Sequence, residues 1–193
     1  MAPRNTSARI ADVALRILAK EGPSAVSMRR VAQAVGITPM AIYHHFPGRK
    51  QLLETVTGNE FARLLEFLKA HPLRGTAENR LILIMQGYAE YAFAHPRIFD
   101  YIFSSPRPSA RRYPQDFRAR RSPTANPVAD LVAELIRARY LRPDDVWEVA
   151  LTLWAHVHGL VTLYHAGRID LSEKQFYALL RRSLRRLIRG LKA

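Results

Sequence analysis

Apolar residues in this sequence recur at three- and four-residue intervals, which is the spacing of one face of an α-helix. The pattern is clearest near the start, at Ile10, Val13, Ala14, Ile17 and Leu18. Strand-like alternation is nearly absent, and capping or helix-breaking residues separate the periodic stretches. The pattern predicts an all-α protein of about nine helices.

The bulk charge limits the partners of such a protein. Thirty basic and 16 acidic residues among 193 give a net charge of +14, which favours a polyanionic partner, although a solubilising arginine-rich surface would give the same excess. The chain has no cysteine, so disulfides and thiol chemistry are excluded. No apolar run approaches the roughly 18 residues of a membrane span, and the polar first residues lack a signal-peptide core. We expect a cytoplasmic protein with no membrane partner.

Residues 28–45 have the pattern of a helix-turn-helix. Ser27 is a predicted helix cap, Gly36 fits the tight turn, and Thr38-Pro39 begins a second short helix. Val31, Val35, Ile37 and Ile42 have the spacing that buries the angle between the two helices, and Ala32 permits their close crossing. A short helix of this kind enters the major groove with its first turn leading.

The outward positions of this motif are the candidate DNA contacts. Hydroxyls and basic side chains suit phosphate or base edges, and Met40 suits a thymine methyl. The candidates are Ser27, Arg29, Thr38, Pro39, Met40, Tyr43, His44, Arg49 and Lys50. The alternative is a plain helical hairpin in which Tyr43 and Phe46 are core aromatics, and for Phe46 a core position is expected.

The segment from Val31 to Leu53, with its Gly-Ile-Thr and Ile-Tyr-His-His-Phe elements, resembles the signature of the tetracycline-repressor (TetR) family of regulators. The likeness covers about residues 7–53. At the position of Arg49 the family usually has a lysine that touches phosphate, and arginine keeps the charge with a different geometry.

A weaker likeness lies in the body. Trp154-Ala-His-Val-His158-Gly159 is similar to a Trp-x-x-x-His-Gly motif of one class of TetR-family C-terminal domains. The resemblance implies a helix-turn-helix DNA-binding domain over residues 1–50 and a ligand-binding and dimerisation domain over residues 51–193. It also implies a homodimer formed through the last two helices, a double-stranded, pseudo-palindromic operator, and release by a small molecule.

The body offers modest independent support for a ligand site. The run Leu81–Met85 is apolar on all sides, which predicts a central buried helix. A mostly apolar effector would suit a cavity with a few polar points, although each candidate is also a plausible core residue. The candidates are Met85, Tyr88, Phe99, Phe103, Trp154 and His158.

Other functions find little support. His156 and His158 face different sides of a helix, and His158 and His165 would lie about 10 Å apart, so we expect no metal site. No phosphate loop, nucleophile motif or carboxylate cluster indicates an enzyme, and no cofactor is expected. A nonspecific basic DNA- or membrane-associating protein remains the other alternative.

Two arginine-rich segments stay open. Residues 104–126 hold six arginines and four prolines and predict a mobile loop, with a lid over the ligand site or an extra DNA arm as alternatives. The last helix carries arginines 181, 182, 185, 186 and 189, which indicate a solvated face beside a dimer seam or a contact with phosphate or membrane.

Overall fold

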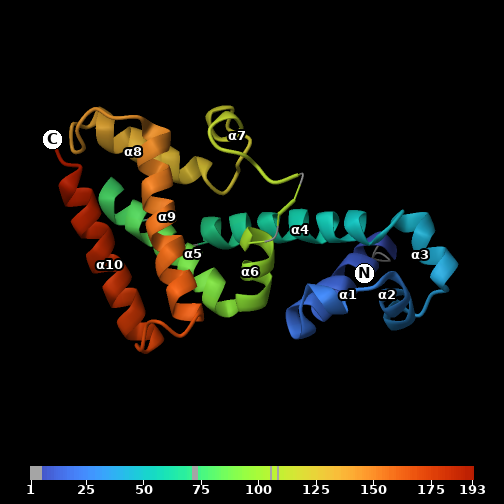
Figure 1. Cartoon of the computed structure of the whole chain (residues 1–193). Helices are drawn as coiled ribbons and strands as arrows, with labels where there is room; N and C mark the ends of the chain where they lie inside the picture. Colours follow the sequence, from blue (N-terminus) through green and yellow to red (C-terminus); the bar gives the residue numbers. More distant parts are fainter. Residues whose placement is uncertain (1–5, 71–73, 105, 108) are drawn as a thin grey trace. The chain divides into compact units, whose positions relative to one another are not determined.

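A computed structural model describes residues 6–70, 74–104, 106–107 and 109–193. Within these residues the secondary structure is helical, with ten α-helices, one short 3-10 helix and a single isolated β-bridge (Figure 1). The all-α prediction is confirmed. The chain divides into two compact units: residues 1–63 with 95–109, and residues 64–94 with 110–193.

The first unit is a small helical head. Its elements are α1 (Thr6–Glu21), the 3-10 helix η1 (Pro23–Ala25), α2 (Met28–Val35), α3 (Pro39–His45), the first part of α4 (Arg49–Ala70) and α6 (Pro96–Ser104). Its core holds the periodic residues of α1 with residues from α2, α3 and α4. The fully covered side chains include Ile10, Ala14, Leu18, Val31, Ala32, Ile42 and Leu52.

Helix α6 belongs to this head although α5, which belongs to the second unit, lies between it and α4 in the sequence. The Arg97 guanidinium donates to the carbonyl oxygens of Ala19 and Lys20, the last turn of α1, where main-chain acceptors have no partner within the helix. From α4, Arg63 pairs with Asp12 of α1 at 3.1 Å and with the buried Glu60 at 2.7 Å. The predicted boundary after residue 50 falls in the first turn of α4, whereas the first unit continues to Arg63 and includes α6.

The second unit is a bundle in which α5 is the central helix. It contains α5 (Ala77–Ala94), α7 (Gln115–Arg118), α8 (Asn126–Arg137), α9 (Val146–His165) and α10 (Glu173–Gly190), with the end of α4. Helix α5 packs against α8, α9 and α10, and α10 lies beside α9 (Figure 1). Leu81, Ile82, Ile84 and Met85 are buried, as predicted for this apolar run.

Side-chain caps mark the starts of several helices. The Thr76 hydroxyl accepts from the Asn79 backbone N–H, and Ser172 with Gln175 forms a capping box at the start of α10. Asn126 is the first residue of α8, and α9 begins directly after its cap, Asp145. Within α10 the residue buried with Phe176, Leu180 and Leu184 is Ile188, because its position continues their three- and four-residue spacing.

The arginine- and proline-rich segment is more structured than a mobile loop. It contains α7, the helix missing from the predicted nine, and the α7 side chain Phe117 is buried. Three ion pairs involve its arginines: Arg118–Asp145 at 2.7 Å, Arg120–Asp130 at 2.9 Å and Arg121–Asp116 at 2.7 Å. Residues 105 and 108 of the segment lie outside the described residues.

Candidate functional site

The helix-turn-helix is built by the local signals that the sequence predicts. The Ser27 hydroxyl accepts from the Arg30 backbone N–H at 3.2 Å and caps α2. Gly36 ends α2 with φ of 81°, a left-handed conformation that glycine adopts without a steric cost. The Thr38 hydroxyl accepts from the Ala41 N–H at 3.1 Å, and Pro39 takes the first helical position of α3. The chain therefore fixes where α3 begins and which side it exposes.

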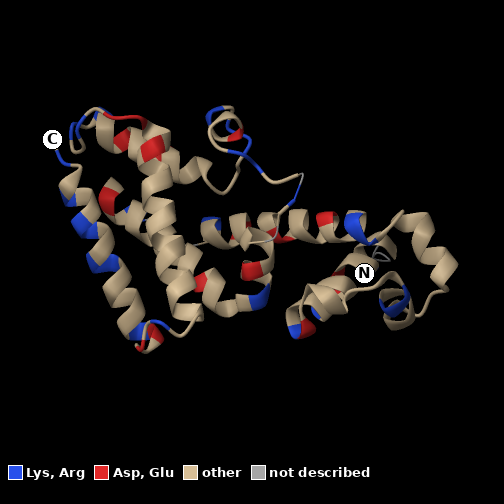
Figure 2. Cartoon of the chain, viewed as in Figure 1, with Lys and Arg blue, Asp and Glu red and all other residues tan. Residues whose placement is uncertain are grey.

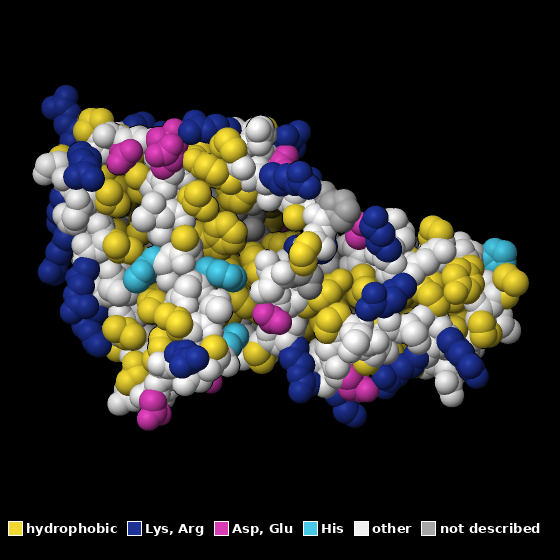
Figure 3. All heavy atoms as spheres, viewed as in Figure 1, with side chains coloured by type: hydrophobic (Ala, Val, Ile, Leu, Met, Phe, Trp, Pro, Cys, Tyr) yellow, Lys and Arg dark blue, Asp and Glu magenta, His cyan; other side chains and the backbone are white. Residues whose placement is uncertain are grey.

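Helix α3 exposes large apolar side chains that its own domain does not need. Met40 is 72% exposed and Tyr43 is 50% exposed, whereas Ile42 and Phe46 are buried. Thr38, Pro39 and His44 are also exposed, and Figure 3 shows apolar and histidine side chains gathered on the surface over α3. Of the two aromatics in the alternative interpretation, Phe46 is a core residue and Tyr43 is a surface residue.

The basic candidates differ in how much of their charge is already engaged. Arg29 and Lys50 are exposed, and Arg30 pairs with Glu21 at 2.5 Å. This contact lowers the pKa of Glu21, chiefly through the hydrogen bond from Arg30. Arg49 donates to the carbonyl oxygens of Val26 at 2.7 Å and Pro23 at 2.5 Å. Arg49 therefore holds the segment before α2, a role that its sequence position did not reveal.

Four of the six predicted ligand-site residues lie in the second unit. Met85 and Tyr88 are buried on α5, and Trp154 and His158 lie one turn apart on α9. The Tyr88 hydroxyl lies 2.9 Å from His158 Nδ1, and the Trp154 and His158 rings lie 6.1 Å apart. Burial raises the pKa of Tyr88 well above its usual value, so this hydroxyl keeps its proton. These four residues combine hydrogen-bonding groups, the Tyr88 hydroxyl and the His158 imidazole, with neighbouring apolar and aromatic side chains.

Phe99 and Phe103 lie elsewhere. Both belong to α6 in the first unit, where their rings are 4.7 Å apart and Phe61 of α4 meets Phe103 edge to face at 5.4 Å. The six predicted residues are thus divided between the two units. The i, i+4 spacing of these two phenylalanines on one helix explains their contact with each other.

The sequence analysis did not identify two further members of this aromatic group, Phe117 on α7 and Trp147 on α9. Phe117 of α7 meets Trp147 edge to face at 6.1 Å and lies 6.1 Å from Trp154. The available signal was the isolated phenylalanine in a polar, arginine-rich segment, because a large apolar residue in such a setting is usually buried.

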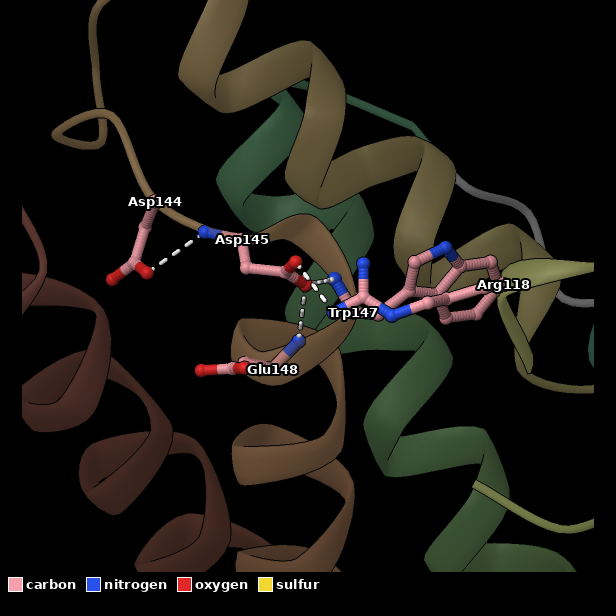
Figure 4. A network of polar contacts seen from close by, with 5 residues as sticks. All are labelled: Arg118, Asp144, Asp145, Trp147 and Glu148. Carbon is pink, nitrogen blue, oxygen red and sulfur yellow. Dashed lines mark hydrogen bonds and ion pairs between the residues drawn. The ribbon is translucent and has the colours of Figure 1, made fainter. Parts of the chain in front are cut away.

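A polar network anchors this part of the body (Figure 4). The Asp145 carboxylate caps α9 by accepting from the N–H groups of Trp147 and Glu148 at 2.9 and 3.0 Å, and it pairs with Arg118. These contacts lower the pKa of Asp145, with the bond from the Glu148 N–H as the largest cause. The carboxylate therefore joins α7 to the first turn of α9.

Nothing in the described residues forms a metal site, since no group of three or more potential protein ligands comes together there. Contrary to the sequence prediction, one described helix, α9, is long and apolar enough to cross a membrane by length and composition. This is weak support for a span, because core helices of soluble proteins share these properties.

Comparisons with known proteins agree with both parts of this description. Residues 10–56 match the model of bacterial regulatory proteins of the tetR family, and residues 81–187 match that of a tetracyclin repressor-like C-terminal domain. The chain is 38% identical over 63 residues to the HTH-type transcriptional repressor KstR of Mycolicibacterium smegmatis, covering 33% of this chain and 31% of that protein. It is 30% identical over 88 residues to the repressor AcnR of Corynebacterium glutamicum, covering 46% and 43%.

These matches therefore span from about a third to less than half of the length of the curated relatives. Solved structures extend the likeness in fold to the whole chain. A protein of unknown function from Rhodococcus sp. RHA1 has a TM-score of 0.83 at 22% identity, covering 100% of this chain and 98% of that one. A putative tetR family transcription regulator from Shewanella sp. PV-4 has a TM-score of 0.70 at 17% identity, covering 96% of each.

The matched families and named relatives are transcriptional regulators rather than enzymes, in agreement with the sequence prediction. The two family models together account for the helix-turn-helix and for most of the body, and the second alone covers more than half of the chain. This chain belongs to the TetR family of bacterial transcriptional regulators.

Proposed function

We propose that this protein is a cytoplasmic transcriptional repressor that binds a pseudo-palindromic operator as a homodimer and releases it when a small molecule occupies the body. The observation that carries DNA binding is the exposed face of α3, where Met40 and Tyr43 are the exposed large hydrophobic residues in the described part of the head. Exposed apolar groups of this kind mark an interaction surface.

The chemistry around α3 supports DNA as the partner. Tyr43 and Thr38 offer hydroxyls, and Met40 offers an apolar contact to a thymine methyl. Arg29 on α2 and Lys50 at the start of α4 are exposed cations suited to phosphates on either side of a groove. Arg49 contributes charge nearby, but two of its contacts already hold the head together.

A homodimer through α9 and α10 is supported by the apolar surface of α9. Only 28% of its most apolar 18-residue window is buried within one chain, and Leu163 is 47% exposed. An apolar helix that its own chain covers so little needs another cover, and a second copy of the same helix provides one. The arginines along the outer side of α10 would border such a seam (Figure 2).

The effector site in this proposal consists of Met85, Tyr88, Trp154 and His158. They combine an apolar wall with one hydroxyl and one imidazole, which suits a small and mostly apolar molecule. Phe99 and Phe103 are left out because they pack with each other and with Phe61 in the first unit. The Trp-x-x-x-His-Gly class of C-terminal domain stays part of the proposal, since Trp154, His158 and Gly159 carry that motif.

Fluorescence anisotropy at about 150 mM salt tests the DNA part. Duplexes from the region upstream of the protein's own gene are compared with base-shuffled copies, and we expect a preference of about 10³-fold or more for a palindromic duplex. A plot of the logarithm of affinity against the logarithm of salt concentration should have a slope of about −0.9 for each phosphate contact. Lys50→Ala should make this slope shallower by about 0.9. Equal weak binding to both duplexes would mean that charge alone drives association.

Release is tested with the same duplex. A coupling of about 1–3 kcal/mol between the two sites would weaken operator binding roughly 5- to 150-fold when the effector is bound. A molecule that binds the body and leaves operator affinity unchanged would contradict release as the mode of regulation.

A further inference from the structure

Phe117 of α7 covers a row of aromatic side chains on α9. The row consists of Trp147, Trp154 and His158, which lie seven and four residues apart and so share one face of the helix. Phe117 is 8% exposed, and its ring centroid lies 6.1 Å from the centroids of both tryptophans. The three residues of the row each keep partial exposure, so Phe117 shields the row without sealing it.

The helix that carries Phe117 is weakly held. Helix α7 has four residues, which is too short to be stable without tertiary contacts. One such contact is the Phe117 ring, and another is the ion pair between Arg118 and Asp145, whose side chains are 49% and 32% exposed. An ion pair this exposed contributes little to stability. The buried Phe117 ring is therefore the main contact that holds α7 to α9, and a ligand that replaces this ring would free α7.

The polar end of the predicted effector site adjoins Trp154, one of the two tryptophans that Phe117 contacts. Tyr88 joins His158 at 2.9 Å and also takes a hydrogen bond from Trp154, whose indole can only donate. The Phe117 ring thus lies near two indole rings, and one of them, that of Trp154, lies near the hydroxyl–imidazole pair. Such surroundings suit a flat aromatic ring with one oxygen.

We propose that Phe117 occupies its own protein's effector site, and that the effector is a planar aromatic molecule with a single hydroxyl or carbonyl oxygen, which takes the place of the Phe117 ring and displaces α7. The proposal rests on the effector-release function above and names the chemical class of the effector. The effector binds only molecules in which α7 is displaced. Its apparent affinity is therefore the intrinsic affinity multiplied by the fraction of molecules in that open state.

The first test needs no ligand and uses the two tryptophans of the sequence, both of which contact Phe117. Arg118→Gln removes the ion pair to α9. Arg120→Gln is the matched control, because Arg120 lies in the same segment, is similarly exposed and pairs with Asp130 of α8 instead. We expect stronger acrylamide quenching of tryptophan fluorescence in Arg118→Gln than in Arg120→Gln or the unsubstituted protein. Equal quenching in all three would overturn the proposal.

The second test uses 2-naphthol, a flat bicyclic ring with one hydroxyl, as the probe. Titration calorimetry should show binding to the full-length protein, about two- to fivefold tighter in Arg118→Gln and at least about tenfold tighter in Phe117→Ala. Phe176→Ala, which empties a fully buried position beside Phe93 and Tyr164, controls for a simple cavity. If this control, or Leu184→Ala should it not fold, gains as much affinity as Phe117→Ala, or if decahydro-2-naphthol binds as tightly as the flat probe, the proposal fails.

Hydrogen exchange of the unsubstituted protein then shows where the probe goes. In the closed state the backbone N–H groups of Asp116, Arg118 and Ala119 bond to the carbonyls of Arg112, Pro114 and Gln115. Saturating 2-naphthol should speed exchange at these three positions, because α7 leaves α9 and frays. Slower or unchanged exchange would mean that Phe117 stays in place, which contradicts displacement.

These readouts contain no DNA, so the two proposals fail separately. If the probe displaces α7 but operator affinity does not change, the proposed effector site is supported and the proposal that the effector releases DNA is contradicted. If hydrogen exchange in α7 does not change but the protein binds its operator specifically, the repressor proposal is supported and the proposed role of Phe117 is contradicted.

Discussion

At the scale of single residues, the head separates side chains that make the fold from side chains that are available to a partner. Thr38 does both, since its oxygen caps α3 while its hydroxyl proton can still be donated outward. Arg49 belongs mainly to the first group through Pro23 and Val26, and Tyr43 belongs to the second because half of its surface is exposed.

Tyr43→Ala should lower operator affinity about 10- to 100-fold, the range for losing one good base or phosphate contact, while the fold stays intact. The ring is half exposed, so its removal leaves little cavity. Anisotropy with the operator duplex measures the loss, and circular dichroism with thermal unfolding checks the fold. Tyr43→Phe separates the hydroxyl from the ring. Unchanged affinity in Tyr43→Ala would remove this residue from the interface.

Arg49→Ala should lower the stability of the head, whereas Lys50→Ala should affect only DNA binding. Arg49→Ala loses two hydrogen bonds to main-chain carbonyls, and we expect about 1 kcal/mol less unfolding free energy because the side chain is exposed. Lys50→Ala should leave that free energy unchanged and weaken DNA binding at low salt. Urea unfolding of both variants provides the comparison, and equal stability of the two would rule out a structural role for Arg49.

At the scale of elements, the sequence predicts best where one local signal is sufficient. The cap at Ser27, the turn at Gly36 and the periodic face of α1 each depend on residues a few positions apart, and all three are confirmed. Helix α7 has no such signal, because Phe117 is ordered by tryptophans about 30 residues later in the chain. The sequence also leaves the start of α9 open, because Pro143 fits a first helical turn and Asp145 fits a cap. In the structure Asp145 is the cap, through its bonds to the N–H groups of Trp147 and Glu148.

The candidate site follows the same division. The exposed face of α3 could be predicted from capping and apolar spacing, whereas the aromatic site needs the packing of α5 against α9. Sequence spacing placed Trp154 and His158 on one face of a helix but gave no way to exclude Phe99, which is apolar and buried in the other unit.

Asp145→Asn should lower the free energy of unfolding of the body near neutral pH and make that free energy less dependent on pH in the acid range. The pKa of Asp145 is lowered in the folded protein, so the stability that its charge provides is present above the unfolded value of about 3.9 and is lost as pH falls through the folded pKa. The difference in unfolding free energy between the two proteins should therefore be largest near pH 7 and should shrink as the pH falls below about 4. Urea midpoints at several pH values measure it, and a constant difference would contradict this role.

At the scale of the whole molecule, assembly should depend on the exposed apolar side of α9. Leu163→Glu places a charge on that side and should convert the dimer to a monomer in sedimentation velocity experiments. Ala138→Glu, an exposed position just after α8, adds the same charge elsewhere and should leave the dimer intact. A Leu163→Glu protein that still sediments as a dimer would move the interface away from this part of α9.

The attachment of α6 to α1 through Arg97 also bears on how new regulators can be engineered from this chain. A hybrid that grafts only the first 50 residues onto another body would leave behind the arginine that satisfies the last carbonyls of α1. The graft would then present its recognition helix on a scaffold with one end unsupported. Transplanting residues 95–109 together with residues 1–63 keeps the head whole, because this compact unit is encoded by two separate stretches of the gene.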